Sequence, residues 1–219
     1  MSSSASPDIV TNGLVLCLDA ADKKSYPGSG TTWFDRSSNG NHGTLTNGPT
    51  FNSANGGSIV FDGTNDRVEC GTFSVPLVTV STWVYKTSNI TEQGICRKNN
   101  SWALSIYQGF LQVAIGNNWN FLNTGYAIPL NTWVNIAYTS NGTGLAGSIV
   151  VYINGLSIFS VSSPAGNITA NTNQVYIGYD DNNWFWNGRI AQTSIYNRAL
   201  TAAEIKQNFN NTKSKFNIL

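Results

Sequence analysis

The amino-acid sequence predicts an all-β domain, either a sandwich or a barrel, that ends in one short α-helix. Apolar and polar residues alternate with a period of two along most of the chain, as they do in half-buried strands. Turn residues, mainly Gly, Asn and Pro, separate these runs at short intervals. Only one segment, close to the end of the chain, has the pattern and the cap of a helix. Many short strands with this spacing are typical of sandwiches and barrels.

The expected strands are runs in which every second residue is apolar. They lie, in chain order, at 14–20, 58–62, 78–86, 102–108, 110–116, 132–140, 148–153, 156–163, 174–180 and 188–197. Asn154-Gly155 separates two of these runs, and both residues tolerate the positive φ of a type I′ turn, which predicts a hairpin. Gln108-Gly109 separates two others, which predicts a second hairpin.

The expected helix begins after Thr201. Thr201 is a favourable N-cap, and Glu204 stands three residues later, which is the spacing of a capping box. Leu200 and Ile205 hold the two positions of a hydrophobic staple, and Phe209 continues the apolar face. The helix is expected to end near the polar pair at 210–211.

The 219 residues suit one domain, since all-β domains often reach this length without dividing. We expect a flexible N-terminal arm at 1–8, a β-sandwich at 9–212 and a C-terminal tail at 213–219. Only 11% of the residues are charged and the net charge is +1, which gives no electrostatic footprint for nucleic acid. No apolar run reaches the length of a membrane span.

The N-terminal segment lacks the basic and apolar regions of a secretory signal, so synthesis in a cytoplasm without export is expected. The chain has three cysteines, Cys17, Cys70 and Cys96. An odd count without secretion argues against a disulfide framework, and we expect small buried apolar side chains instead.

The carboxylates do not form a catalytic pattern. Polysaccharide hydrolysis needs two carboxyl groups close together, and the only glutamates are Glu69, Glu92 and Glu204, which lie far apart in the sequence. Glu204 is already assigned to the helix cap. His42 is the only histidine, so nucleophilic or zinc chemistry lacks partners in the sequence. We expect the chain not to be an enzyme.

One loop, at 33–43, has the oxygen spacing of a metal site. Asp35, Ser37, Asn39 and Gly40 match the first half of a calcium-binding EF-hand loop, but Thr46 stands where the bidentate Glu belongs. The alternative is an Asx turn, in which Asp35 and Asn39 bind their own backbone and shape the connection.

Two stretches combine aromatic rings with amides and carboxylates, as carbohydrate sites do. One supplies Asn117, Trp119 and Phe121, and the other supplies Asp181, Asn183, Trp184 and Trp186. If the second stretch is a strand, both tryptophans point to one face. Two alternatives remain open from the sequence: these rings cover the core, or they form a protein interface.

Five segments together resemble the laminin-G-like branch of the concanavalin A-like lectin/glucanase superfamily. They are GLVLCLDAADKKSYPGSGTTWFDRSSNGNHGTL, GGSIVFDGTNDRVECG, VSTWVYK, VYINGLSI and GRIAQTSIYNRALTAAEI, in this order. The resemblance implies a two-sheet antiparallel jelly roll with a helix after the last strand. Its first segment resembles versions in virion proteins of tailed phages, including marine ones.

The resemblance also implies a structural calcium ion at an edge of the sandwich. Its ligands would be Asp35 with Asn39 or Asn41, and Asp62 and Asp66 would add to them. The sequence departs from the family in its last strand, where Ala191 and Gln192 replace the usual acidic residues. Few carboxylates imply weak calcium binding.

From these observations we expect a non-enzymatic structural or decorating protein on the head or tail of a tailed phage. Its partners would be other virion proteins, host-surface glycans and further copies of itself. A lectin module of a bacterial surface protein is the first alternative, and a polysaccharide hydrolase is the second.

Overall fold

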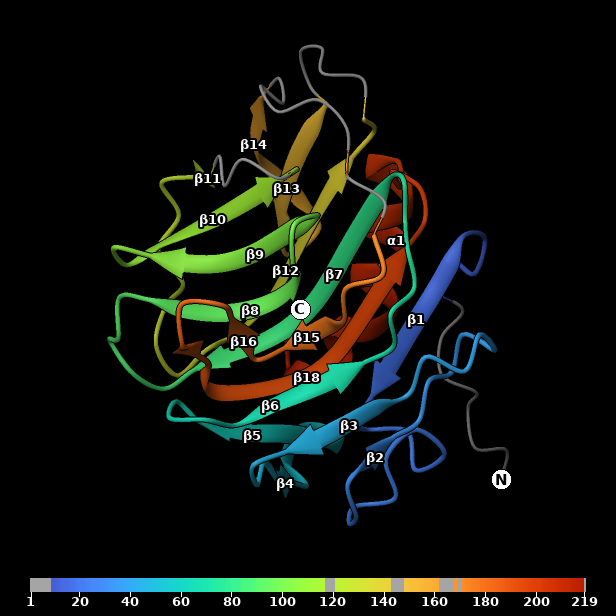
Figure 1. Cartoon of the computed structure of the whole chain (residues 1–219), viewed down its shortest axis with the longest axis vertical. Helices are drawn as coiled ribbons and strands as arrows, with labels where there is room; N and C mark the ends of the chain where they lie inside the picture. Colours follow the sequence, from blue (N-terminus) through green and yellow to red (C-terminus); the bar gives the residue numbers. More distant parts are fainter. Residues whose placement is uncertain (1–8, 117–120, 143–147, 162–167, 169–170, 219) are drawn as a thin grey trace.

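The computed structural model describes residues 9–116, 121–142, 148–161, 168 and 171–218. These residues form a sandwich of two antiparallel sheets with one short α-helix near the C-terminus (Figure 1). The predicted fold class is therefore confirmed, and the sandwich replaces the barrel alternative.

The first sheet contains eight strands within the described residues. Seven of them are in the order β14, β13, β12, β7, β18, β5 and β4, and β1 pairs with part of β18. Their bounds are β1 Leu14–Asp19, β4 Thr50–Asn52, β5 Ser58–Asp62, β7 Val78–Lys86, β12 Trp133–Ser140, β13 Ile149–Ile153, β14 Leu156–Val161 and β18 Asn187–Tyr196.

The second sheet also contains eight strands in this part of the chain, in the order β11, β10, β9, β8, β15, β6, β3 and β2. Their bounds are β2 Thr32–Trp33, β3 Gly43–Thr46, β6 Arg67–Cys70, β8 Gln93–Lys98, β9 Trp102–Tyr107, β10 Phe110–Ile115, β11 Phe121–Asn123 and β15 Val175–Ile177. A separate hairpin of β16 (Tyr179–Asp180) and β17 (Trp184–Phe185) lies against β8 of this sheet.

The core lies between the two sheets, because the alternating residues of each strand turn one set of side chains inward. The set includes Val80 and Val84 from β7 and Leu104 and Ile106 from β9, all of them fully buried. The three cysteines are also buried and free, as predicted. Burial raises the pKa of the Cys17 thiol to about 12, so this group behaves as a small apolar side chain.

Both predicted hairpins are present. Asn154 and Gly155 have φ values of 51° and 76° and join β13 to β14, as a type I′ turn requires. Gln108 and Gly109 have φ values of 50° and 84° and join β9 to β10. The local sequence was sufficient here because glycine and asparagine tolerate the left-handed conformation.

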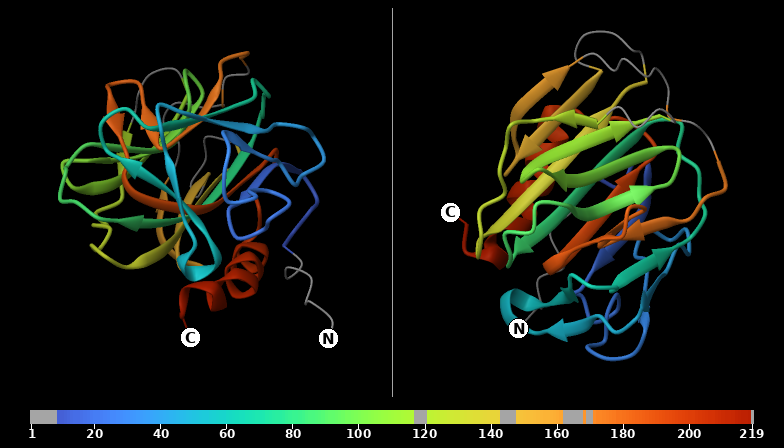
Figure 2. Two further views of the ribbon diagram at one scale, coloured as in Figure 1. Left: turned by 90° about the horizontal axis from the view of Figure 1, so that it is seen from below. Right: turned by 60° about the vertical axis from the view of Figure 1, so that its left-hand side comes forward.

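The predicted capping box is also confirmed. Thr201 Oγ1 accepts the backbone N–H of Glu204 at 3.3 Å, and Glu204 Oε2 accepts the backbone N–H of Thr201 at 2.9 Å. The helix α1 spans Ala202–Thr212, close to the predicted end. Leu200 and Ile205 pack in one apolar cluster with Tyr152 and Tyr196 of the first sheet, so α1 covers the outer face of that sheet (Figures 1 and 2).

The segment predicted as a C-terminal tail is packed against the domain as far as residue 218. Lys213–Phe216 form a 3₁₀ helix, and the Phe216 ring stacks on Trp83 with the centroids 4.1 Å apart. Trp83 points out of the first sheet and needs a cover, which only the tertiary structure reveals. The predicted arm at 1–8 lies outside the described residues.

Among the described residues, no helix has both the length and the apolar character needed to cross a membrane.

Candidate functional site

Six aromatic side chains gather over the outer face of the second sheet, the face that points away from the core. We define this aromatic face by residues of β9, β10, β15 and the β16–β17 hairpin. None of the six side chains is buried. The β16–β17 hairpin lies in front of the second sheet in the view of Figure 1. The six residues are Tyr107, Phe110, Tyr176, Tyr179, Trp184 and Phe185.

The β16–β17 hairpin can lie on the sheet because position 94 of β8 has no side chain. A Cβ on Gly94 would collide with the backbone of Tyr179 and Asp180. Beside it, the Arg97 guanidinium binds Asp180 through Nη1 and Asp181 through Nη2, the latter at 2.8 Å. The side chains of Arg97 and Asp180 are almost completely buried. This ion pair therefore fixes the hairpin to the sheet.

Trp184 at the start of β17 lies over Tyr107 at the end of β9. Their ring centroids are 5.5 Å apart and their planes are 26° from parallel. Phe110 is directly opposite Tyr107 in the β9–β10 ladder, so its ring belongs to the same group. Tyr107 and Phe110 are 37% and 39% exposed, which leaves a broad apolar surface in contact with water.

The other three rings form a second group next to the first. Tyr179 contacts Phe185 at 5.1 Å and Tyr176 at 5.2 Å between centroids. The Arg67 guanidinium lies 5.9 Å from the centre of the Tyr179 ring. The two groups are joined through β17, because Trp184 and Phe185 are consecutive.

Carboxylates neutralise the two arginines of this face. Arg67 binds Glu69 at 2.7 Å, and Arg97 binds both Asp180 and Asp181. Burial raises the pKa of Asp180, and the charge of Arg97 opposes this rise. The two arginines and the three carboxylates, Glu69, Asp180 and Asp181, together leave a net charge of −1 on the face.

The predicted carbohydrate-site residues divide into three sets. Asp181, Asn183 and Trp184 lie together on the β16–β17 hairpin, with Asn183 exposed in the turn. Phe121 is on β11, the edge strand of the same sheet, where it pairs with Ala114 of β10. Asn117 and Trp119 lie outside the described residues.

Trp186, the last of the predicted carbohydrate-site residues, is not part of the aromatic face. Its side chain is 0% exposed and packs in the main core, so it offers no surface to a ligand. The expectation that Trp184 and Trp186 share one face assumed a continuous strand. The structure instead ends β17 at Phe185 and begins β18 at Asn187, and the chain turns inward between them.

Sequence reasoning missed most of the aromatic face. The alternation that places Leu104 and Ile106 inward also places Tyr107 outward, and this signal was available. Nothing local indicates that Tyr107 meets Trp184, because the two residues are far apart in the sequence and a buried ion pair brings them together.

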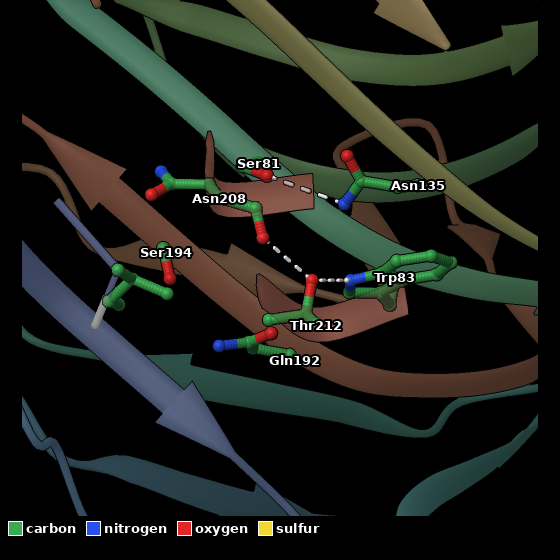
Figure 3. A pocket seen from close by; sticks show the side chains of 8 residues that line it. Ser81, Trp83, Asn135, Gln192, Ser194, Asn208 and Thr212 are labelled. Atoms are coloured by element: carbon green, nitrogen blue, oxygen red, sulfur yellow. Dashed lines mark hydrogen bonds between the residues drawn. The ribbon is translucent and has the colours of Figure 1, made fainter. Parts of the chain in front are cut away.

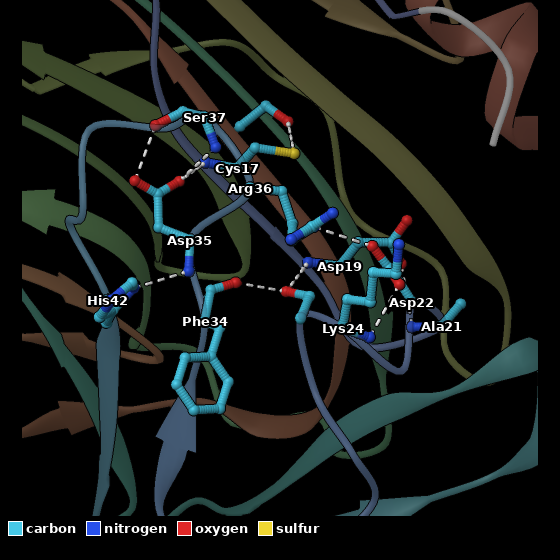
Figure 4. Close-up of polar contacts among 12 residues, drawn as sticks. Cys17, Asp19, Ala21, Asp22, Lys24, Phe34, Asp35, Arg36, Ser37 and His42 are labelled. Atoms are coloured by element: carbon cyan, nitrogen blue, oxygen red, sulfur yellow. Dashed lines mark hydrogen bonds and ion pairs between the residues drawn. The ribbon is translucent and has the colours of Figure 1, made fainter. Parts of the chain in front are cut away.

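The Asp35 carboxylate is a structural centre for the loop that follows β2 (Figure 4). Oδ1 accepts the backbone N–H groups of Cys17 and Ser37, both at 2.8 Å. Oδ2 accepts the Ser37 hydroxyl at 2.7 Å and the Asn41 N–H at 3.0 Å. The two carboxylate oxygens therefore accept four hydrogen bonds.

The neighbouring amides attach the same loop to β1. Asn39 Nδ2 donates to the carbonyl of Leu14 at 3.0 Å, and Asn41 Nδ2 donates to the carbonyl of Val15 at 2.8 Å. His42 Nδ1 accepts the backbone N–H of Asp35 at 3.0 Å. These contacts are those of the Asx-turn alternative, extended to a neighbouring strand.

The proposed calcium ligands do not fit a calcium ion in this arrangement. Calcium needs oxygen lone pairs, and those of Asp35 already face N–H and O–H donors. Asp62 Oδ1 accepts two backbone N–H groups in its own turn, and Asp66 Oδ2 accepts the N–H of Asp62. The described residues contain no group of three acidic, histidine or cysteine side chains that could hold a metal ion.

A small polar pocket lies between the first sheet and α1 (Figure 3). It is lined by Ser81, Trp83 and Asn135 on the sheet and by Asn208 and Thr212 on the helix, among others. Thr212 Oγ1 accepts the Trp83 ring N–H at 2.9 Å and donates to the Asn208 carbonyl at 2.8 Å. These bonds serve to hold α1 on the sheet.

Several solved protein domains have the same fold as this chain. Domain 4 of AbnA, an extracellular arabinanase from Geobacillus stearothermophilus solved with arabinotriose, has a TM-score of 0.70 at 20% identity. The alignment covers 89% of this chain and 97% of that domain. The binding domain of Paraclostridial Mosquitocidal Protein 1 has a TM-score of 0.68 at 19% identity, with 91% and 52% covered.

The binding domain of botulinum neurotoxin DC, solved with rat synaptotagmin II, has a TM-score of 0.71 at 19% identity. The alignment covers 93% of this chain and 52% of that domain, so the chain spans about half the length of the toxin domains. At these identities the likeness shows the fold. No curated protein sequence matches the chain.

A family model described as the concanavalin A-like lectin/glucanases superfamily matches residues 62–206. This match covers more than half of the chain and includes every residue of the aromatic face. With its two-sheet jelly roll and its C-terminal helix, the chain belongs to the laminin-G-like part of the concanavalin A-like lectin/glucanases superfamily.

Proposed function

We propose that the chain is a non-enzymatic module that binds carbohydrate at the aromatic face of the second sheet. The observation that carries this proposal is the half-buried Trp184 stacked on Tyr107, with Asp181 and Asn183 in the adjoining turn. A sugar ring has apolar C–H faces that pack on aromatic rings, and its hydroxyl groups bind carboxylates and amides. Both kinds of group are present on one hairpin.

The charge of the face favours neutral sugars. Both arginines are held by carboxylates of the same face, and the remaining charge is negative. An acidic sugar would meet like charge and would have to compete with Glu69 or Asp181 for an arginine. We therefore expect neutral hexose or pentose chains to bind more tightly than their sialylated or uronic counterparts.

Two related folds add support. One is a domain of an arabinanase solved with arabinotriose, and another belongs to a botulinum neurotoxin of type C whose cell entry depends on gangliosides. Both ligands contain sugars, although one is neutral and the other acidic. The fold is thus compatible with carbohydrate binding. For this chain, the negative charge of the aromatic face favours neutral over acidic sugars.

A glycan array followed by calorimetry tests the proposal. Trp184→Ala should abolish binding while the melting temperature stays near that of the wild type, because the ring is only half-buried. Phe34→Ala is the matched control, since Phe34 is an aromatic residue of 41% exposure that follows β2, at the other edge of the same sheet. If no glycan binds, or if Trp184→Ala binds normally, the proposed site is excluded.

We further propose that bound sugar is not cleaved. Retaining hydrolysis needs two free carboxyl groups about 5.5 Å apart. Glu69 is paired with Arg67, Asp180 is buried against Arg97, and Glu204 is bound to Arg198 at 2.6 Å. Incubation with laminarin or agar should release no reducing ends, and release that disappears in Glu69→Gln would overturn this part.

The setting that we propose is the particle of a tailed phage, where the module would meet host-surface glycans. The resemblance of residues 13–45 to virion proteins of such phages supports it. Mass spectrometry and immunogold labelling of purified particles from the phage that encodes the chain test this setting. Particles that lack the protein would favour the alternative, a lectin module of a bacterial surface protein.

A further inference from the structure

The long middle part of the chain carries no charged residue at all. From residue 99 to residue 179 the sequence contains no Asp, Glu, Lys, Arg or His. This stretch forms the strands from β9 to β15, including β14 at one edge of the first sheet and β11 at one edge of the second. Soluble proteins commonly protect sheet edges with charged side chains, especially lysine, or with proline. These edges have neither in their strands.

The β14 strand is the more exposed of the two edges. It spans six residues, Leu156–Val161, and pairs only with β13 within the described part of the chain. Leu156 is 64% exposed and Ile158 is 41% exposed, although both are large and apolar. Within the described residues, the outer edge of β14 therefore offers backbone groups without a strand partner, together with apolar side chains.

We infer that β14 is an interface between two copies of this chain, which pair their β14 strands antiparallel about a two-fold axis. In an antiparallel pair about a two-fold axis, the residues near the middle of the strand lie close to their own copies, so a charge there would meet its own sign. A strand of Leu, Ser, Ile, Phe and Val avoids this repulsion. Pairing would also satisfy the free N–H and C=O groups and would join the two first sheets into one.

This interface leaves the aromatic face free, because that face belongs to the second sheet. It does not depend on carbohydrate binding. A dimer would carry two aromatic faces, which would raise the avidity for a surface that displays many copies of one sugar. A six-residue edge is short, so we expect the dimer to form in a concentration-dependent way.

Light scattering coupled to size exclusion, over a series of protein concentrations, tests the inference. The wild type should approach twice the chain mass of 23.7 kDa as the concentration rises. Ile158→Lys and Leu156→Lys should remain at the monomer mass, because a lysine on an edge strand opposes pairing with another strand. At residue 158, near the middle of β14, the two charges would also face each other across the axis. Circular dichroism should show a folded sandwich in both variants, since the two positions are exposed.

Thr50→Lys is the matched control, because Thr50 is an exposed residue on β4, at the opposite edge of the same sheet. It should dimerise like the wild type. A wild type that stays monomeric, dimers that persist in both β14 variants, or equal loss of dimers in Thr50→Lys would each overturn the inference.

Discussion

The Arg97 guanidinium lies between Asp180 and Asp181 and joins the β16–β17 hairpin to β8 of the second sheet. This contact connects residues that are far apart in the sequence. It places Trp184 over Tyr107 and so assembles the aromatic face. The proposed binding site therefore depends on an ion pair that does not itself belong to the exposed surface.

Arg97→Ala should destabilise the protein by about 3–5 kcal/mol, because it leaves the buried Asp180 carboxylate without its charge partner. Urea denaturation measures this change. Arg67→Ala is the control, since its pair with Glu69 is partly exposed and should contribute less than about 1 kcal/mol. Equal effects of the two substitutions would contradict the role given to the buried pair.

Glu204 should make the stability depend on acid pH. The Arg198 hydrogen bonds, followed by those of Thr201, lower the pKa of Glu204 to about 2. A carboxyl whose pKa is depressed on folding stabilises the protein above its unfolded pKa of about 4.3, and this contribution is lost as the pH falls toward 2. Glu204→Gln keeps the helix cap but removes the charge.

The difference in unfolding free energy between the wild type and Glu204→Gln should thus be greatest near neutral pH and should disappear near pH 2. Because the pair is partly exposed, we expect a difference below about 1 kcal/mol. Denaturation curves at several pH values measure it. A difference that grows on acidification would show that another group is responsible.

Phe216→Ala should destabilise the domain by about 3 kcal/mol, because it removes a buried ring that stacks on Trp83 and lies 4.8 Å from Trp133. Ser214→Ala is the control in the same 3₁₀ helix, since Ser214 is exposed. Thermal unfolding compares the two. If Phe216→Ala is as stable as Ser214→Ala, the packing of residues 213–218 does not contribute to stability.

The Asp35 carboxylate should stabilise the fold without a bound calcium ion. We expect the melting temperature to be the same in calcium and in EDTA, and Asp35→Ala to cost at least about 2 kcal/mol under both conditions. The reason is that three backbone N–H groups and the Ser37 hydroxyl would lose their acceptor. A calcium-dependent rise in the wild type that is absent from Asp35→Ala would establish a metal site instead.

Local sequence patterns are sufficient to predict the elements whose cause lies within a few residues. The period of two predicted the strands, Asn154-Gly155 predicted a hairpin through its tolerance of positive φ, and Thr201 with Glu204 predicted the helix cap. Each of these elements depends on residues a few positions apart, so no long-range contact is needed to predict it.

Which side chains a ligand can reach depends on contacts between distant parts of the chain. Trp184 and Trp186 are two residues apart, yet one lies on the surface and the other in the core, because the chain turns inward between β17 and β18. Asp35 has the pattern of a metal ligand, but the N–H groups of β1 and of its own loop occupy its oxygens. Burial and hydrogen-bond partners arise from contacts across the sandwich, and a local pattern does not contain them.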